Sequence, residues 1–357
     1  MSQVYIAGFG LASTLASDLA ATLQQPLKPQ QPAMRQLEGY ADPVPYFAIA
    51  QASSEPLPPS WYARCRMLVR SVIAESGCSS RTGALYLASA SINLGAIEAG
   101  EDYAVNLPGF LDELAAMLEW QGPVFWINTA CTSGLNALMA ARDGINAGLF
   151  DEAIVLGVEL ENRLTLAGFA GMQLLSSDRS RPFATDRNGL VLGEAVAALR
   201  LSRAPSRWRI AGGAQVIDSS QASGASVAAY LTMLEQTLAR AQLTPEEIQL
   251  VKVQAAGSPA NDAIEAQALN QFFAPVPALI SLKPLLGHTL GASGAAELAL
   301  LLSLIERDQW PTPDTAALDP QLNIALADKR PSARYILACN LGFGGSHSAL
   351  AIEDRGR

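Results

Sequence analysis

Our expectations for the fold and the chemistry of this chain start from the segment Val124-Phe125-Trp126-Ile127-Asn128-Thr129-Ala130-Cys131-Thr132-Ser133-Gly134-Leu135. Its apolar start, residues 124–127, predicts a buried strand, and the apolar spacing that begins at Leu135 predicts a helix. Cys131 therefore lies where a strand turns into a helix. Amide dipoles at a helix start favour a thiolate and leave backbone N–H groups free to bind an oxyanion. We infer that Cys131 is a nucleophile. The alternative is a buried cysteine that packs as a small hydrophobic side chain.

The composition indicates an α/β protein. Half of the 357 residues are hydrophobic and only 16% are charged, which suits a sheet covered by helices on both faces. The net charge of −9 argues against a nucleic-acid-binding protein. The four cysteines and two histidines suggest neither a disulfide framework nor a metal site. The sequence has no signal peptide and no apolar run of about 18 residues or more, which predicts a cytoplasmic protein without a membrane span.

Strand and helix patterns alternate along the whole chain. The expected strands are residues 4–10, 46–50, 84–89, 124–127, 151–159, 195–201, 208–213, 250–256, 279–282, 335–339 and 348–353. The expected helices are residues 15–23, 61–76, 111–120, 135–142, 227–241, 260–272 and 295–305. Residues 25–60, rich in Pro and Gln, are interpreted as a surface excursion.

The pattern restarts near the middle of the chain. The fragment Ile210-Ala211-Gly212 echoes Ile6-Ala7-Gly8, so the two isoleucines are expected to be equivalent. An internal repeat accounts for an α/β chain of this length that contains no linker. We therefore expect an N-terminal half over residues 1–205 and a C-terminal half over residues 206–357.

Residues 175–194 crowd Asp, Arg, Pro and Gly together before the apolar run 195–201 begins. Two interpretations stay open at this point. The segment is either a solvated loop that leads into a strand, or a buried polar network that shapes a site.

Three segments together resemble the β-ketoacyl-carrier-protein synthases (ketosynthases) of fatty-acid and polyketide elongation. They are Thr129–Gly134, Lys283–Gly294 and Asn340–Gly345, with Arg181-Pro182-Phe183 and Asp186-Arg187-Asn188-Gly189 matching between them. The resemblance runs from about Val4 to Glu353, in the right order and spacing. It implies the thiolase fold, an α/β fold with two similar βαβαβαββ halves in α-β-α-β-α layers. It also implies a dimer. Residues 90–120 depart from the family pattern.

The resemblance also implies roles for individual residues. Cys131 would take an acyl group, as a thioester, from the phosphopantetheine of an acyl-carrier protein. The backbone amides of Cys131 and Phe343 would form an oxyanion hole, and the Phe343 ring would gate the pocket. His288 would donate a hydrogen bond to a malonyl thioester carbonyl, and Lys283 and Glu297 would orient that site. The alternative for His288 is a helix-start cap without chemistry. No bound cofactor or metal ion is expected.

One position departs sharply from the family. Condensing members carry a second histidine in an Asn-Ala-His-Gly-Thr loop. Here the loop over residues 254–262 is two residues shorter, and Ala256 holds the histidine position. Losing one such hydrogen-bond donor lowers a rate by about a hundredfold to a thousandfold, so a normal decarboxylative condensation is not the expected activity. His347, four residues after Phe343, either supplies the missing donor or caps the Gly344-Gly345 turn.

Three functions remain open. The first is a partner subunit, comparable to the chain-length factors of type II polyketide systems or to the ketosynthase-like partners of bacterial aryl-polyene clusters. Such a subunit pairs with an active ketosynthase as a heterodimer and shapes the shared acyl tunnel, although those factors usually lack the cysteine that is present here. The second is a β-ketoacyl synthase or acyltransferase of altered mechanism, for which a homodimer is possible. The third is a thiolase relative, which the Gly287-His288-Thr289 context disfavours.

Two expectations can be checked directly. The side chains of Cys131 and His288 are expected within one pocket, closer than about 10 Å, because acyl transfer needs near-contact geometry. Cys131 is expected to be more reactive than Cys65, Cys78 and Cys339, because by sequence pattern it alone lies at a helix N-terminus.

Overall fold

The computed structural model describes residues 3–50, 58–102, 107–220, 224–315 and 317–356. Its main feature is a ten-stranded mixed sheet with the order β11-β10-β12-β13-β9-β1-β8-β6-β4-β5. The strands of the N-terminal half are β1 (Tyr5–Ala12), β4 (Ala84–Ala88), β5 (Val124–Ile127), β6 (Glu152–Glu159) and β8 (Ala195–Ser202). Those of the C-terminal half are β9 (Trp208–Ile217), β10 (Leu250–Lys252), β11 (Ala278–Ile280), β12 (Tyr335–Gly342) and β13 (Ser346–Asp354).

The two halves repeat one strand arrangement. Counted along the chain, each half runs from its outer edge inward as third, second, fourth, fifth and first strand. The two first strands, β1 and β9, meet antiparallel at the centre. There Ile6 lies opposite Trp208, and the backbone N–H of Ile210 donates to Val4 O at 3.0 Å. If Ile6 is equivalent to Ile210, then Trp208 is equivalent to Val4. The pairing of Ile6 with Trp208 then corresponds to the pairing of Ile210 with Val4, in agreement with the expected repeat.

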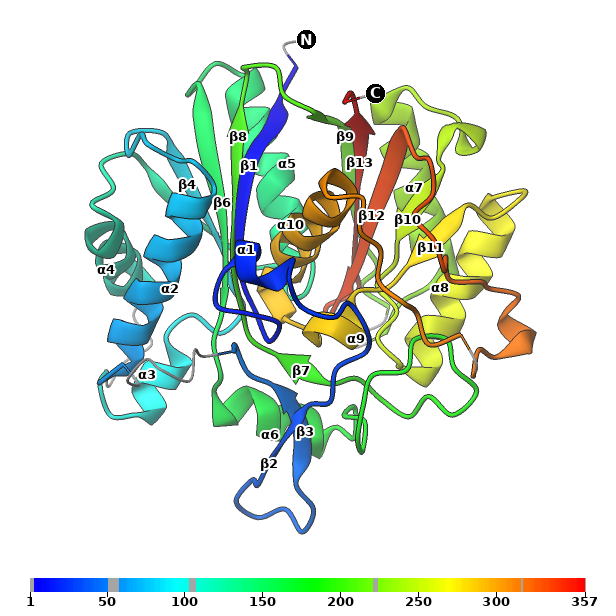
Figure 1. Ribbon diagram of the computed structural model, residues 1–357, viewed down its shortest axis with the longest axis horizontal. Helices are drawn as coiled ribbons and strands as arrows, with labels where there is room; N and C mark the ends of the chain where they lie inside the picture. The colour runs from blue at the N-terminus through cyan, green and yellow to red at the C-terminus, as the bar shows by residue number, and fades with distance from the viewer. Residues whose placement is uncertain (1–2, 51–57, 103–106, 221–223, 316, 357) are drawn as a thin grey trace.

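The helices form three layers around the sheet (Figure 1). The inner layer lies between the two half-sheets, and each outer layer covers one half-sheet. The inner helices are α5 (Ser133–Asn146) and α10 (Ser293–Glu306); the outer ones are α2 (Trp61–Glu75) with α4 (Leu107–Leu118) on the N-terminal half, and α7 (Val227–Ala241) with α8 (Pro259–Phe272) on the C-terminal half. This is the layered thiolase fold that the sequence predicted.

Burial explains the layers. All residues from Ser293 to Ile305 of α10 are buried, so this helix is apolar on every side, as a helix inside a core must be. One apolar cluster joins α5 and α10 to the inner faces of both half-sheets. A second cluster joins α2 and α4 to the N-terminal half, and a third joins α7 and α8 to the C-terminal half. None of the described helices is both long enough and apolar enough to cross a membrane.

Most of the short elements in the connections were not indicated by the sequence pattern, whereas the helix expected at 15–23 is present at 19–22. The excursion over residues 25–60 holds two short strands that join a third from further along the chain in a small sheet, and the strand expected at 46–50 lies at 44–47. Residues 51–57 of that excursion lie outside the described part. The short elements are β2 (Ala33–Arg35), β3 (Val44–Phe47), β7 (Leu192–Gly193), α1 (Leu19–Thr22), α3 (Leu94–Glu98), α6 (Arg163–Gly171), α9 (Lys283–Leu286), and the 3-10 turns at Pro245–Glu247, Leu290–Ala292 and Pro320–Leu322.

Candidate functional site

The loop between β5 and α5 holds Cys131 in a strained turn. Ala130 has φ of 53°, a left-handed conformation that costs free energy for a residue with a Cβ. Ser133 stabilises the turn, because its Oγ donates to Ala130 O at 2.6 Å and accepts from Thr129 N at 2.9 Å. The strand-to-helix position predicted for Cys131 is confirmed. Its side chain faces the interior and is only 5% exposed.

His288 reaches this cysteine from the other half of the molecule. The distance between His288 Nε2 and Cys131 Sγ is 3.0 Å, which confirms that the two residues share a pocket. His288 Nδ1 lies 3.1 Å from Ser293 Oγ, at the start of α10. The serine fixes the ring so that Nε2 faces the sulfur.

A buried ion cluster lies behind this pair. Lys283 Nζ contacts Glu297 Oε1. The resemblance to the ketosynthases implied that these two residues lie together. The sequence analysis missed Lys252, whose Nζ contacts the other oxygen, Glu297 Oε2, at 2.6 Å. Burial alone would raise the pKa of Glu297, but the two ammonium groups outweigh it and lower that pKa. The signal for Lys252 was a lysine inside an apolar strand pattern, where a charge needs a partner.

The electrostatics of Cys131 correct one expectation. Burial raises the pKa of the Cys131 thiol to about 12, although the Lys283 ammonium and the backbone N–H groups of Phe343 and Cys131 act to lower it. The helix start therefore does not produce a low-pKa thiol in this pocket, because desolvation outweighs the dipole. Burial, helped by the Lys283 and Lys252 ammonium groups, also lowers the pKa of His288 well below its usual value. The resting pair is a neutral thiol beside a neutral imidazole.

Phe343 lies where the resemblance placed it. Its backbone N–H is directed at the Cys131 sulfur, and its ring stacks on Phe169 with centroids 5.3 Å apart. Both rings line a cavity of about 480 Å³ that also contains Cys131, His288 and Ala256. The Cys131 sulfur therefore lies beside the backbone N–H groups of Phe343 and Cys131, in a cavity lined by two aromatic rings.

Ala256 faces this cavity from a loop of fixed shape. Asp262 accepts from the backbone N–H groups of Ala256 at 3.2 Å and Gly257 at 3.0 Å. Ser180 Oγ donates to Ala256 O at 2.8 Å, and Gly189 N donates to Gly257 O at 3.0 Å. These bonds from the 175–194 segment show that it is a polar network supporting the site, rather than a loop held by solvent alone. The position of the missing histidine is therefore a methyl group on a well-held loop.

His347 lies away from the reactive pair. It is buried, and it is not among the residues that line the Cys131 cavity. Its Nδ1 lies 2.8 Å from Gly345 O, and its Nε2 accepts from Ser226 N at 3.2 Å. Both ring nitrogens are thus used in backbone contacts, as in the turn-capping interpretation of the sequence.

Glu159 is a further buried acid that the sequence analysis did not single out. Its carboxylate accepts from Ser91 Oγ, Ala90 N and Gly291 N. Burial raises the pKa of Glu159 to about 7, and its charge acts on Cys131. Within the described ranges, no group of three or more His, Cys, Asp and Glu side chains is arranged to hold a metal ion.

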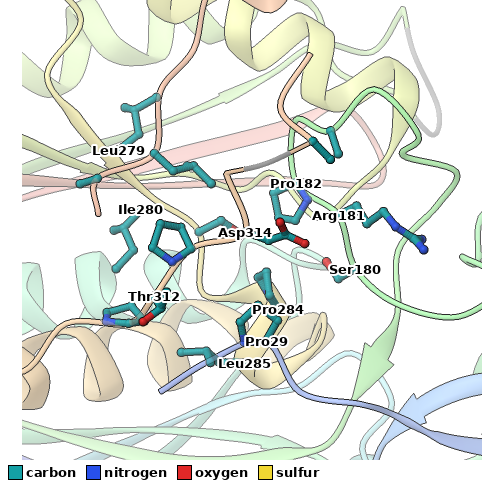
Figure 2. A pocket seen from close by; sticks show the side chains of 17 residues that line it. Pro29, Ser180, Arg181, Pro182, Leu279, Ile280, Pro284, Leu285, Thr312 and Asp314 are labelled. Atoms are coloured by element: carbon teal, nitrogen blue, oxygen red, sulfur yellow. The ribbon is translucent and has the colours of Figure 1, made fainter. Parts of the chain in front are cut away.

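A second pocket, shown in Figure 2, lies next to the Ala256 loop. It measures about 590 Å³ and is lined mainly by proline and aliphatic side chains, among them Pro182, Ile280 and Leu285. Ser180 and Ser281 face it and donate to the carbonyls of Ala256 and Ala255. The reactive side chains do not open into this pocket, so it is a neighbour of the site rather than part of it.

Comparison with protein families finds two matches. The family described as "Beta-ketoacyl synthase, N-terminal domain" matches residues 113–207, and "Beta-ketoacyl synthase, C-terminal domain" matches residues 210–315. Together they cover more than half of the chain. Among curated proteins, 3-oxoacyl-[acyl-carrier-protein] synthase 2 of Mycobacterium leprae is 31% identical over 255 residues, which are 63% of this chain and 59% of that protein. Nodulation protein E of Rhizobium leguminosarum is 28% identical over 259 residues, 67% of this chain and 64% of that protein.

Solved structures resemble the fold over nearly the whole chain. The complex of the ketosynthase ApeO with its chain length factor ApeC, from Xenorhabdus doucetiae, matches with a TM-score of 0.85 and 24% identity, covering 99% of this chain and 98% of the other. The ishigamide ketosynthase/chain length factor matches with a TM-score of 0.82 and 20% identity, covering 99% and 100%. By contrast, the chain spans about six tenths of the length of the curated relatives named above.

Proposed function

Because this chain belongs to the β-ketoacyl synthase family, we propose that it is a ketosynthase-like subunit that accepts an acyl group on Cys131 and works beside an active ketosynthase. In this role it resembles a chain-length factor that shapes an acyl tunnel, but one that has kept its nucleophile. The acyl donor is the phosphopantetheine thioester of an acyl-carrier protein.

One observation carries the proposal. Cys131 Sγ lies 3.0 Å from His288 Nε2, whereas the position of the second family histidine is the methyl group of Ala256. The first feature supports acyl transfer, which needs a nucleophile, a proton acceptor and an oxyanion hole. The second removes a donor that decarboxylation of a malonyl group needs. The site therefore has the groups that acylation needs but lacks one that decarboxylative condensation needs.

The acyl-transfer step can be written from these residues. His288 Nε2 takes the Cys131 proton as the sulfur attacks the thioester carbonyl carbon. The developing oxyanion is held by the backbone N–H groups of Cys131 and Phe343. The carbon–sulfur bond to the carrier breaks, and the pantetheine thiolate leaves and takes the proton from His288. Attack and deprotonation occur together, so the raised pKa of Cys131 is compatible with the step.

The partner surface is proposed at β5. This strand is the outer edge of the sheet and pairs only with β4 in the described part of the chain. Phe125 on β5 is 42% exposed and stacks on Tyr86 of β4. An open strand edge with an exposed aromatic side chain favours addition of a partner strand. We place the ketosynthase partner, or a second copy of this chain, along this edge.

A condensing enzyme of altered mechanism is the second candidate. The observation in its favour is the ion cluster of Lys283 and Glu297 behind His288, which a pure structural partner does not need. His347 is a poor replacement for the missing histidine, because both of its ring nitrogens face backbone groups.

Intact-protein mass spectrometry tests the proposal. The purified chain is incubated with carrier proteins that bear short- or medium-chain acyl groups, and separately with malonyl-carrier protein. We expect an added acyl mass on the wild type, none on Cys131→Ala, and no conversion of malonyl- to acetyl-carrier protein.

Each result decides between the candidates. Malonyl decarboxylation or a β-ketoacyl product made by the chain alone would establish the condensing enzyme instead. No acylation by any carrier protein, with or without a co-expressed ketosynthase, would reject the proposed acyl transfer.

A further inference from the structure

Lys252, at the end of β10, is a second buried lysine to which the mechanism above gives no role. Its Nζ donates to three oxygens: Glu297 Oε2 at 2.6 Å, Cys339 O at 2.7 Å and Asn340 Oδ1 at 2.7 Å. An ammonium group has three N–H donors, so its hydrogen bonds are all satisfied. The side chain has no exposed surface.

The ion cluster carries an excess positive charge. Lys252 and Lys283 share the single carboxylate of Glu297, and none of the three side chains is exposed. With both lysines protonated, the cluster has one more positive than negative charge, although burial lowers the pKa of Lys283 and the Lys252 charge also acts on Glu265. Water screens a buried charge weakly, so this excess acts on the groups around it.

Two contacts connect Lys252 with the reactive pair. Asn340 accepts from Lys252 through Oδ1, and through Nδ2 it donates to Cys131 O at 3.2 Å. The ammonium groups of Lys252 and Lys283 also oppose protonation of His288, whose pKa burial lowers.

We propose that Lys252 is a positioning residue of this site: it holds Asn340, which fixes the backbone at Cys131, and its buried ammonium group disfavours a second positive charge on His288. An uncharged imidazole can take the Cys131 proton, whereas an imidazolium cannot. Lys252 therefore prepares the acyl transfer without touching the substrate. This inference deepens the proposed function. It rests on that function in one respect, namely that the uncharged imidazole of His288 takes the proton of Cys131.

Other titratable groups near the pair come from several elements. They are Glu159 on β6, Asp262 and Glu265 on α8, Lys283 on α9, and Glu297 on α10. Burial raises the pKa values of Glu159 and Glu265 to about 7 and that of Asp262 to about 6, so all three titrate in the range where His288 is followed. The test therefore compares variants in which these groups are unchanged.

Histidine-selective ¹³C labelling of the untagged chain tests the proposal, because the chain has only two histidines. The ring resonance of His288 is followed against pH in the wild type, Lys252→Met and Lys252→Gln, with His347 as the internal control. We expect His288 of the wild type to titrate well below the ordinary histidine pKa, and to titrate measurably higher than in the wild type in both variants. His347 should titrate alike in all three proteins.

A failure of this proposal can be told apart from a failure of the proposed acyl transfer, because the titration uses neither carrier protein nor substrate. A folded Lys252 variant whose His288 titrates as in the wild type would overturn the proposal. So would recovery of the wild-type titration in Lys252→Gln alone, because glutamine restores hydrogen bonding without charge. If neither variant folds, the wild type still decides: a His288 that becomes charged near its ordinary pKa contradicts the proposal.

Discussion

Gly134 on α5 and Gly294 on α10 lie backbone to backbone where the two inner helices begin. A Cβ built on Gly134 would lie 2.9 Å from Gly294 Cα, and one built on Gly294 would lie 2.9 Å from Gly134 C. The two glycines occupy corresponding places in the two halves, each in the inner helix that lies between the third and the fourth strand along the chain. This close approach brings the Cys131 loop of one half against the His288 segment of the other.

Gly134→Ala should therefore destabilise the fold by about 1–3 kcal/mol, because the added methyl group forces the inner helices apart. The free energy of unfolding, measured with denaturant, checks this. Gly168→Ala is the matched control, because that helical glycine has no heavy atom within 4 Å of a built Cβ. The control should be neutral or stabilising by up to about 1 kcal/mol. Equal effects of the two substitutions would contradict the packing argument.

Ala256→His should raise malonyl-carrier-protein decarboxylation by about tenfold to a hundredfold over the wild type, because it restores a hydrogen-bond donor on the cavity wall. Loss of radiolabelled carbon dioxide from malonyl-carrier protein measures this. Ala256→Leu adds similar bulk without a donor and should leave the rate at the wild-type level. If both variants behave alike, the missing histidine is not what limits condensation.

His347→Ala should leave acylation of Cys131 unchanged and lower the free energy of unfolding by about 1–3 kcal/mol, because Ser226 N loses its acceptor. Burial lowers the pKa of His347. The stability that its neutral ring contributes is therefore present above the unfolded-state pKa, about 6.5, and is lost as the pH falls below it. The stability difference between wild type and variant should shrink from about pH 7 to about pH 5. A difference that grows over this range would refute the assignment.

Alkylation of Cys131 by iodoacetamide should accelerate by about tenfold per pH unit from about pH 7 to about pH 9, without levelling, because burial raises the pKa of its thiol to about 12. Peptide mass spectrometry under limiting reagent gives the rates. Cys131 should be labelled before Cys65 and Cys339, which are fully buried and outside the cavity. A plateau near neutral pH would show instead that the helix start governs this thiol.

Phe125→Lys should weaken the proposed dimer, because it places a charge on the open edge of β5. Light scattering should show a larger monomer fraction than in the wild type. Ile217→Lys is the control, since Ile217 is 65% exposed but lies on β9 at the centre of the sheet. A wild type that is already a stable monomer at micromolar concentration would contradict the interface.

The fold could be predicted from the sequence pattern, which also singled out the groups that we propose to be reactive. Strand and helix periodicity follows from local side-chain patterns, and the echo between Ile6 and Ile210 indicated the repeat. The motifs around Cys131, His288 and Phe343 carried the family resemblance because each is a contiguous segment. Ala256 could be recognised as a departure for the same reason.

The interactions among these groups depend on the tertiary structure. Lys252 forms a buried ion pair with Glu297, which lies on another element of the fold. Burial, a property of the whole packed chain, raised the pKa of Cys131 where the local helix start predicted a lower one. Contacts from Gly345 and Ser226 likewise engaged both nitrogens of His347. Local pattern specifies which groups a chain carries, whereas their charge and partners depend on desolvation and on distances that arise when distant segments meet.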